Sequence, residues 1–324
     1  MAISCGKFDR MTLLQHIRVG ENIHRSVHTC TSIVEIEYLG LKCAGKKILD
    51  ELLAQQGSFP EMVIHIDRFE KECRLLSQVR HPNIVQFLGV HFQQGVRAPI
   101  LVMEFLPTNL TSCIEQYGIL PKEISYSILH DVALGLCYLH SQIPPIIHRA
   151  LVSNNILLTS NMTAKISDLG SARVLAEQQQ GDERDIKIRY EEGHAFMPPE
   201  VMKARPYDIY IDEFSYGVMM IHILSGKWPN PLSVPIRINP DGTMTAVTEP
   251  ERREVFLRAI GDDHPLMDLI LQCIANYPQA RPHVTKIVER LAEMVRLFPA
   301  TIADRLEVLS LAENINFLPE SDQP

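Results

Sequence analysis

The sequence predicts an α+β protein with two lobes, a small lobe built on an antiparallel sheet with one main helix and a larger lobe that is mainly helical. In the first third of the chain, short segments rich in β-branched residues surround one amphipathic stretch. After Pro107 the pattern changes, and apolar residues recur at helical spacing over longer segments. A length of 324 residues is sufficient for one large domain of this kind.

The small lobe is predicted to contain a β-hairpin and two further strands. Ile33 to Tyr38 is rich in β-formers, Gly40 interrupts it, and Leu41 to Ile48 resumes as the second strand of the hairpin. Two short apolar segments, Ile84 to Val90 and Ile100 to Phe105, predict the other strands. These segments are expected to form one sheet.

One amphipathic helix is predicted in the small lobe, over Ile66 to Val79. Phe69, Cys73 and Leu76 recur at helical spacing with charged residues between them, which defines an apolar face. Pro82 follows closely and favours a stop.

The larger lobe is predicted to contain a series of helices around one interrupted segment. Lys122 to His140 is a long periodic helix, and Ile146 to Leu158 is apolar but broken, as expected for a loop between short strands. Further helices are predicted over Asp212 to Leu224, Leu266 to Ala275 and Val284 to Leu297.

The tail of the chain is predicted to add a last helix that packs on the domain. Ile302, Leu306 and Leu309 lie at helical spacing within Thr301 to Asn314. The alternative is the start of a coiled coil or partner helix, but the turns are too few to define heptads. The expected segments are a lead at 1–13, the small lobe at 14–103, the large lobe at 104–299 and the tail at 300–324.

Composition and charge limit the partners that the chain can have. A net charge of -8 is a poor match for polyanions, so no nucleic-acid partner is expected. The longest apolar runs, Ile100 to Leu106 and Val218 to Leu224, are too short to span a bilayer, so no membrane segment is expected in this chain.

The seven cysteines are scattered and include no CxxC pair, which predicts reduced thiols and no disulfide framework. Met1 to Arg10 lacks an apolar core of signal-peptide length. Both observations favour a cytoplasmic protein, and they also fit the cytosolic part of a receptor.

The segment Ile147 to Leu158 reads I-H-R-A-L-V-S-N-N-I-L-L and resembles the catalytic loop of protein kinases, H-R-D-L-x-x-x-N-x-L, with His148 and Arg149 at its first two positions. Further motifs follow that family's order: His81 to Val85 after the small-lobe helix, Ser167 to Gly170 for D-F-G, Met197 to Glu200 for A-P-E, Asp212 to Gly217 at the start of a central helix, and Arg281-Pro282. The resemblance covers about Leu14 to Leu297 and is closest to the tyrosine-kinase-like and tyrosine kinase groups.

This resemblance implies a bilobal protein-kinase fold, a site for ATP and Mg²⁺, and protein partners in signalling. It also implies that Arg281 pairs with the glutamate of the A-P-E position, Glu200. It specifies neither a substrate nor an oligomeric state.

Cys43 to Lys46 resembles the V-A-I-K motif. Because side chains alternate along a strand, Ala44 and Lys46 share one face, whereas Lys47 points away. The resemblance implies that Lys46 contacts the nucleotide phosphates and that Glu72 orients it. The alternative is a solvated lysine and a surface carboxylate, and the order of the motifs favours the functional interpretation.

The resemblance also implies which residues meet adenine. Ile33, Ala44 and Leu157 correspond to a hydrophobic column that adenine completes. Met103 corresponds to the gatekeeper, and Glu104 to Leu106 correspond to the hinge whose backbone contacts adenine. Simple core packing is the alternative role and is compatible with the first.

Asn155 and Asp168 stand at the positions that hold magnesium in protein kinases. A carboxylate and an amide oxygen are the hard ligands that Mg²⁺ prefers. The alternative is turn chemistry, since both residue types are common in turns.

Ala150 occupies the position of the catalytic aspartate, which is the largest departure from the family pattern. A methyl group can neither accept the proton of a substrate hydroxyl nor position the nucleophile, and general-base assistance contributes about 10²–10⁴ in rate. The neighbours Val152, Ser153 and Asn154 are not bases near neutral pH. Turnover is therefore expected to be lost or strongly impaired.

The glycine-rich loop of the family is also missing. Ser26, His28 and Thr31 are predicted to stand at its three glycine positions, with Ile33 at the valine. Glycine lets backbone N–H groups approach phosphates without an intervening Cβ. We therefore expect binding of ATP and Mg²⁺ to be weak or lost.

The segment from Ser171 to Phe196 is rich in acidic residues and lacks the threonine that often precedes the A-P-E motif. Arg149 would normally pair with a phosphate in this segment. A carboxylate of the segment or a phosphorylated Tyr190 is a candidate substitute. A solvated acidic loop is the simpler interpretation.

These departures predict a pseudokinase, a kinase fold used for nucleotide binding, scaffolding or signalling. The alternative is an ATP-dependent Ser/Thr or Tyr kinase that is weakly active, or active in a parent form with aspartate at position 150. The catalytic aspartate, the glycine-rich loop and the threonine before the A-P-E motif are all missing. Several separate losses of this kind favour natural loss of catalytic function over a single engineered change. A structural module that binds no nucleotide is the third interpretation.

Overall fold

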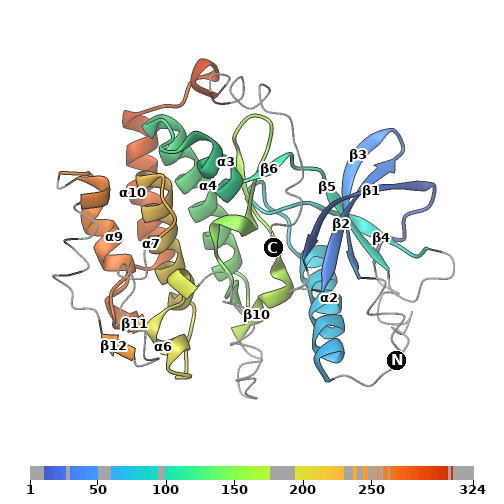
Figure 1. The fold of residues 1–324 in the computed structure, drawn as a ribbon, viewed down its shortest axis with the longest axis horizontal. Helices are drawn as coiled ribbons and strands as arrows, with labels where there is room; N and C mark the ends of the chain where they lie inside the picture. Colours follow the sequence, from blue (N-terminus) through green and yellow to red (C-terminus); the bar gives the residue numbers. More distant parts are fainter. Residues whose placement is uncertain are drawn as a thin grey trace, which may run out of the picture.

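The computed structural model shows two lobes side by side, a sheet-rich lobe that contains α2 and a larger helical lobe (Figure 1). The predicted bilobal α+β fold is confirmed. The structure describes residues 11–26, 30–49, 60–93, 99–175, 194–229, 236–238, 244–246, 251, 254, 258–261, 263–305 and 308.

The small lobe is built on an antiparallel sheet in the order β1-β2-β3-β5-β4. Its strands are β1 (Ile17–Ser26), β2 (Thr31–Tyr38), β3 (Leu41–Ile48), β4 (Phe87–His91) and β5 (Ile100–Glu104). The predicted hairpin is confirmed, because β2 and β3 pair along their whole length and Gly40 turns the chain at φ +80°.

β4 starts at Phe87, not at Ile84 as predicted. The residues before it hydrogen-bond to the other lobe: Val85 donates its N–H to the carbonyl of Ile166, and Ile166 donates to the carbonyl of Asn83. The apolar segment therefore divides between two sheets, and β-propensity alone does not show where it divides.

α2 (Pro60–Gln78) begins earlier than the predicted Ile66 and carries the predicted apolar face. Phe69, Cys73 and Leu76 are each at most 2% exposed. Proline suits the first turn of a helix, where its missing N–H would have no intrahelical acceptor.

The large lobe contains α3 (Leu110–Tyr117), α4 (Lys122–His140), α6 (Pro199–Met202), α7 (Tyr210–Ser225), α9 (Met267–Cys273) and α10 (Val284–Leu297). Its short strands are β6 (Thr108–Asn109), β7 (Ile146–Ile147), β8 (Ile156–Leu158), β9 (Ala164–Ile166), β10 (Arg173–Val174), β11 (Ile236–Ile238) and β12 (Met244–Ala246). The four predicted helices are confirmed, two of them with their predicted ends. α3 was not predicted, although Asn109 caps it by accepting the N–H of Ser112 at 2.9 Å.

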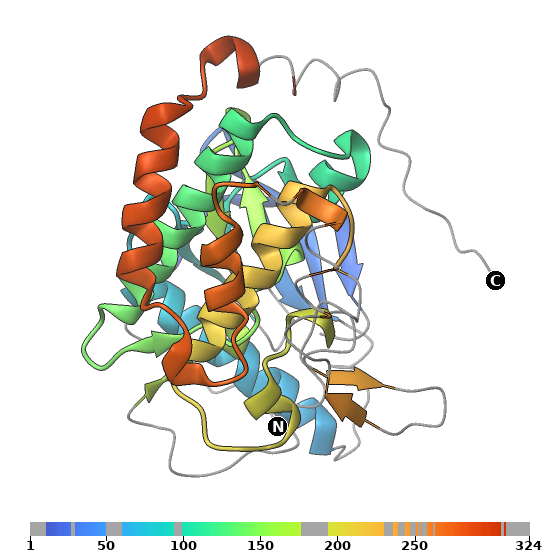
Figure 2. The same ribbon diagram turned by 90° about the vertical axis from the view of Figure 1, so that its left-hand side faces the viewer.

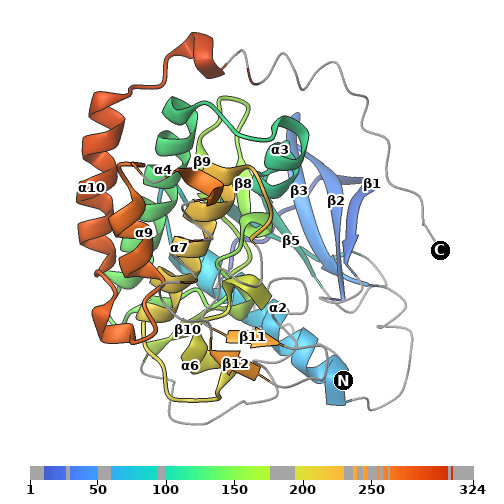
Figure 3. The same ribbon diagram turned by 60° about the vertical axis from the view of Figure 1, so that its left-hand side comes forward.

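α7 passes through the core of the large lobe. Figures 2 and 3 show it among α4, α9 and α10. Every side chain from Ile211 to Ile223 is buried, because neighbouring helices cover it on several sides. No helix in the described parts of the chain is both long and apolar enough to cross a membrane.

The predicted pairing of Arg281 with Glu200 is confirmed. The two guanidinium nitrogens lie 2.6 and 2.9 Å from the two carboxylate oxygens, and both side chains are buried. This bidentate pair ties the start of α6 to the segment before α10.

Both ends of the described chain pack on the lobes. Val90 exchanges backbone hydrogen bonds with Thr12 and Leu14. Ile302 to Arg305 form a helical turn, and Val308, only 3% exposed, joins the core of the large lobe. The rest of the predicted tail helix lies outside the described residues, and the expected segment boundaries stay predictions.

Candidate functional site

Lys46, Glu72 and Asp168 meet between the lobes, as the motifs predicted. Lys46 extends from β3, Glu72 from α2, and Asp168 precedes the turn at Leu169–Ser171. The Lys46 Nζ lies 2.8 Å from Glu72 Oε2 and 3.0 Å from Asp168 Oδ1. Three elements far apart in sequence thus place one cation between two carboxylates.

The electrostatics of this group follow from burial and mutual charge. Burial by itself lowers the pKa of Lys46, but Asp168 and Glu72 outweigh it and raise the pKa above its usual value. Burial raises the pKa of Glu72 to about 7, and Lys46 opposes that rise. Burial would also raise the pKa of Asp168, but Lys46 lowers it. Lys46 is therefore a cation and Asp168 an anion at neutral pH.

The catalytic loop, Ile147 to Leu158, is bound to the segment that carries Asp168. Asn155 donates its side-chain N–H to the carbonyl of Ala150 at 2.8 Å. Ser167 donates both its backbone N–H and its hydroxyl to the carbonyl of Asn155, at 2.8 and 2.9 Å. The ring of His148 lies 2.9 Å from the carbonyl of Ser167. The two candidate magnesium residues are thus joined through one hydrogen-bonded network.

The start of the catalytic loop is anchored by Asp212 of α7. Its carboxylate accepts the backbone N–H of His148 at 2.7 Å and that of Arg149 at 2.9 Å. Arg149 adopts φ +66°, a conformation that a non-glycine residue rarely takes without such support. From the sequence, Asp212 is predicted only to lie at the start of a helix, although the motif that contains it also indicates this anchoring role.

The side chain of Arg149 is 4% exposed and contacts two residues on either side of the acidic segment. Its Nε donates to the carbonyl of Ser171 at 2.7 Å, and one terminal nitrogen lies 2.6 Å from the hydroxyl of Tyr207. Tyr190 and most of the acidic segment lie outside the described residues, so the predicted partnership stays a prediction.

The residues predicted to surround adenine come together in the small lobe and at the start of the large one. Ala44 pairs with Met103 across β3 and β5, and Ile33 pairs with Lys46 across β2 and β3. Met103 is buried in one apolar cluster, against which Leu106 and Leu157 also pack.

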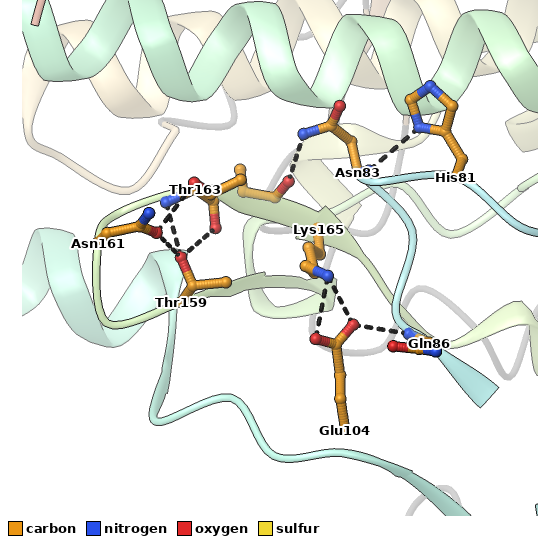
Figure 4. Close-up of polar contacts among 9 residues, drawn as sticks. His81, Asn83, Gln86, Glu104, Thr159, Asn161, Thr163 and Lys165 are labelled. Carbon is orange, nitrogen blue, oxygen red and sulfur yellow. Dashed lines mark hydrogen bonds and ion pairs between the residues drawn. The ribbon is translucent and has the colours of Figure 1, made fainter. Parts of the chain in front are cut away.

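Glu104 directs its side chain into a polar contact between the lobes, which the sequence did not predict. Figure 4 shows its carboxylate facing Lys165 of β9, at 2.7 and 3.0 Å, and accepting the backbone N–H of Gln86 at 2.7 Å. In the same region Asn83 donates to the carbonyl of Ala164 at 3.0 Å. The hinge residue thus fixes the end of β5 to the large lobe.

Replacing Lys165 by methionine is expected to lower the free energy of unfolding by about 1–3 kcal/mol, because Glu104 would lose its charged partner while remaining largely buried. Lys203→Met, at an exposed position, is the control and should stay within about 0.5 kcal/mol of the parent. Chemical denaturation measures both. Equal stability of the two variants would show that the Glu104 contact contributes nothing net.

The predicted glycine-loop positions lie at the end of the β1–β2 hairpin. Ser26 pairs with Thr31 as its last rung, and His28 lies outside the described residues. Ser26 and Thr31 both carry a Cβ, so this hairpin differs chemically from a glycine-rich phosphate cradle.

The residues present suit a magnesium ion held partly by phosphates. Because the side-chain nitrogen of Asn155 donates to Ala150, its oxygen is the atom left for a cation. Asp168 supplies an ionised carboxylate. Among the described residues no group of three or more His, Cys, Asp or Glu side chains could hold a metal alone. A magnesium ion bound by one or two protein side chains usually takes its other oxygen ligands from phosphates and water.

The family model described as protein tyrosine and serine/threonine kinase matches residues 60–291, well over half of the chain. The chain belongs to the protein kinase family. This kinase chain is 29% identical over 305 residues to a probable serine/threonine-protein kinase, kinY, from Dictyostelium discoideum, covering 88% of the chain and 49% of the relative. It is 30% identical over 273 residues to the serine/threonine-protein kinase VIK from Arabidopsis thaliana, covering 83% of the chain and 58% of the relative.

A third relative, the serine/threonine-protein kinase STY46 from Arabidopsis thaliana, is 28% identical over 233 residues, or 70% of the chain and 37% of the relative. The chain thus spans between 37% and 58% of the length of these relatives. The predicted resemblance to protein kinases is confirmed.

Proposed function

We propose that this protein is a pseudokinase that retains a nucleotide site and transfers phosphate poorly or not at all. The observation that carries the proposal is Ala150, buried in the catalytic loop where the family has its proton-accepting aspartate. The surrounding loop keeps its anchors on Asp212 and Asn155. The change at position 150 therefore removes a reactive group while the contacts that hold this loop remain.

The retained ion pairs support nucleotide binding. Lys46, oriented by Glu72, would hold the α- and β-phosphates, and Asn155 with Asp168 would hold Mg²⁺ between them and the phosphates. Bound Mg²⁺ neutralises phosphate charge. Ile33, Ala44, Leu106 and Leu157 would contact adenine. Because the glycine-loop positions carry side chains, the affinity is expected to be low.

A weakly active protein kinase is the second candidate, and the Lys46–Glu72–Asp168 arrangement favours it. Much of phosphoryl transfer rests on positioning and electrostatics, so loss of one carboxylate need not abolish the reaction. In either case the partners would be signalling proteins. Reduced thiols suit the cytoplasm. The acidic net charge argues against nucleic acid as a partner.

Nucleotide binding is tested by thermal shift with ATP plus magnesium and with ATP alone. The parent protein is expected to melt at a higher temperature with millimolar Mg-ATP, because a ligand of the folded state adds RT ln(1 + [L]/Kd) to stability. The shift should be smaller without magnesium and absent in Lys46→Met, which lacks the phosphate contact.

Lys47→Met is the matched control, since Lys47 is the next residue of β3 and points to the other face. It should keep the Mg-ATP shift. If millimolar Mg-ATP does not raise the melting temperature of the parent, the proposal of a retained nucleotide site is refuted. The remaining interpretation would be a binding module that takes no nucleotide.

A further inference from the structure

Three ionisable side chains lie buried together where α4 meets α7, next to the catalytic loop. His140 ends α4, and Asp212 and Glu213 belong to the first turn of α7. Their side chains are at most 1% exposed. His140 Nε2 lies 3.0 Å from Asp212 Oδ2, and His140 Nδ1 lies 3.4 Å from Glu213 Oε1. The imidazole thus lies between two carboxylates.

The two carboxylates differ in the hydrogen-bond donors that they accept from. Asp212 accepts two backbone N–H groups of the catalytic loop in addition to its contact with His140. Neither oxygen of Glu213 has a hydrogen-bond partner among the described residues, and its contact with His140 has an ion-pair distance without hydrogen-bond geometry. A buried carboxylate without donors is costly when ionised. Glu213 therefore needs either a proton of its own or a positive charge on His140.

The other ionisable groups nearby do not supply that charge. His148 interacts electrostatically with the neighbouring Asp212. Cys273 of α9 faces Glu213 as a neutral thiol, because burial raises its pKa. Arg281, which interacts electrostatically with Cys273, has its guanidinium bound to Glu200. His140 remains the group able to balance Glu213.

We propose that His140 and Glu213 together hold a buried proton beside the catalytic loop, and that the fold loses stability when rising pH removes this proton. The proton belongs to the pair, since the two groups are close enough to titrate together. This proposal depends on neither phosphoryl transfer nor nucleotide binding.

The direction of the pH effect follows from the two shifts. Burial lowers the pKa of His140, but the adjoining carboxylates raise it to about 9. Burial raises the pKa of Glu213. Both groups hold a proton more tightly in the folded chain than in the unfolded one, where histidine has a pKa of about 6.5. The contribution of His140 is complete below that pH and is lost as pH rises through 9.

The test compares melting temperature against pH, from about 7.5 to 8.5, in the parent, Glu213→Gln and His222→Gln. This window lies above the pKa of an unfolded histidine, about 6.5, and below the pKa of about 9 that His140 has in the folded chain. The amide is the same size as the carboxylate and removes its charge. The parent curve should fall with pH, and the Glu213→Gln curve should be flatter, because His140 then loses one of the carboxylates that raise its pKa. His222→Gln should keep the parent slope in this window. Burial lowers the pKa of His222 to about 4 in the folded chain, and an unfolded histidine, with a pKa of about 6.5, is also mostly neutral above about pH 7.5.

Buried cysteines also lose protons on unfolding in alkali, but they are the same in all three proteins and cancel in the comparison. Calorimetry in buffers of different ionisation enthalpy counts the protons directly. At pH near 7.5 the parent is expected to release up to about one proton more than Glu213→Gln on unfolding. Equal slopes with equal proton release would overturn the proposal. If Glu213→Gln does not fold, absence of proton release from the parent at this pH would overturn it.

Discussion

Replacing Ala150 by aspartate is expected to raise the rate of phosphoryl transfer from ATP to a protein hydroxyl by about 10²–10⁴, the usual contribution of a general base. The backbone at this position is already fixed on both sides. The carbonyl of Ala150 accepts a hydrogen bond from Asn155, and the preceding Arg149 N–H is held by Asp212. An aspartate introduced here would therefore project from an ordered loop.

The measurement is transfer of labelled phosphate to a generic protein substrate and to the protein itself. Ala150→Asn is the matched control, because it has the size of aspartate without a basic carboxylate, and it should stay at the parent rate. The double variant Ala150→Asp with Lys46→Met should lose the gain, which would exclude a contaminating kinase.

One outcome would contradict this expectation, and a second would contradict the pseudokinase proposal. If Ala150→Asp still shows the Mg-ATP thermal shift but transfers no more phosphate than Ala150→Asn, the loss of the glycine-rich loop limits turnover. If the parent itself transfers phosphate in a manner that depends on Lys46, the weakly active kinase replaces the pseudokinase as the function.

Replacing Arg281 by methionine is expected to lower the free energy of unfolding by about 3–5 kcal/mol, because Glu200 would remain buried without its counter-ion. The same guanidinium donates to the carbonyls of Tyr210 and Ala275, at 2.8 and 3.0 Å, so these acceptors also lose a partner. Urea denaturation of both proteins measures the difference.

Arg290→Met is the control for this prediction. Arg290 lies 2.6 Å from Glu293, but both side chains are more than two fifths exposed, so the cost should be at most about 1 kcal/mol. Adding Glu200→Leu to Arg281→Met should recover part of the loss, because the second change removes the uncompensated buried charge. A single Arg281→Met as stable as Arg290→Met would contradict the prediction that the buried ion pair with Glu200 stabilises the fold.

The family and the main ion pairs of the site could be predicted from the sequence alone. Strand alternation was sufficient to prefer Lys46 over Lys47, and the structure places Lys46 on Glu72 and Asp168. The long helices α4 and α10 have their predicted ends, because apolar periodicity over many residues is a strong local signal. Ala150 could be assigned to the position of the catalytic aspartate without a structure, since the order of the motifs identifies that position.

The division of one apolar segment between two sheets could be seen only in the tertiary structure. Ile84 and Val85 look like the start of a strand, but Ile84 forms an isolated bridge with Ile166 of β9, and Val85 donates its N–H to the carbonyl of Ile166. β4 therefore begins only at Phe87. That choice depends on residues of another lobe, which local propensity does not contain.

Contacts between distant side chains were likewise decided by the tertiary structure. Glu104 with Lys165 and His140 with Glu213 join residues from different elements, and nothing in the local sequence of either partner indicates the other. Their charges become consequential only because packing removes water from around them, which makes an unmatched charge costly. Sequence therefore determined which groups are present, and packing determined which of them must share a proton or form an ion pair.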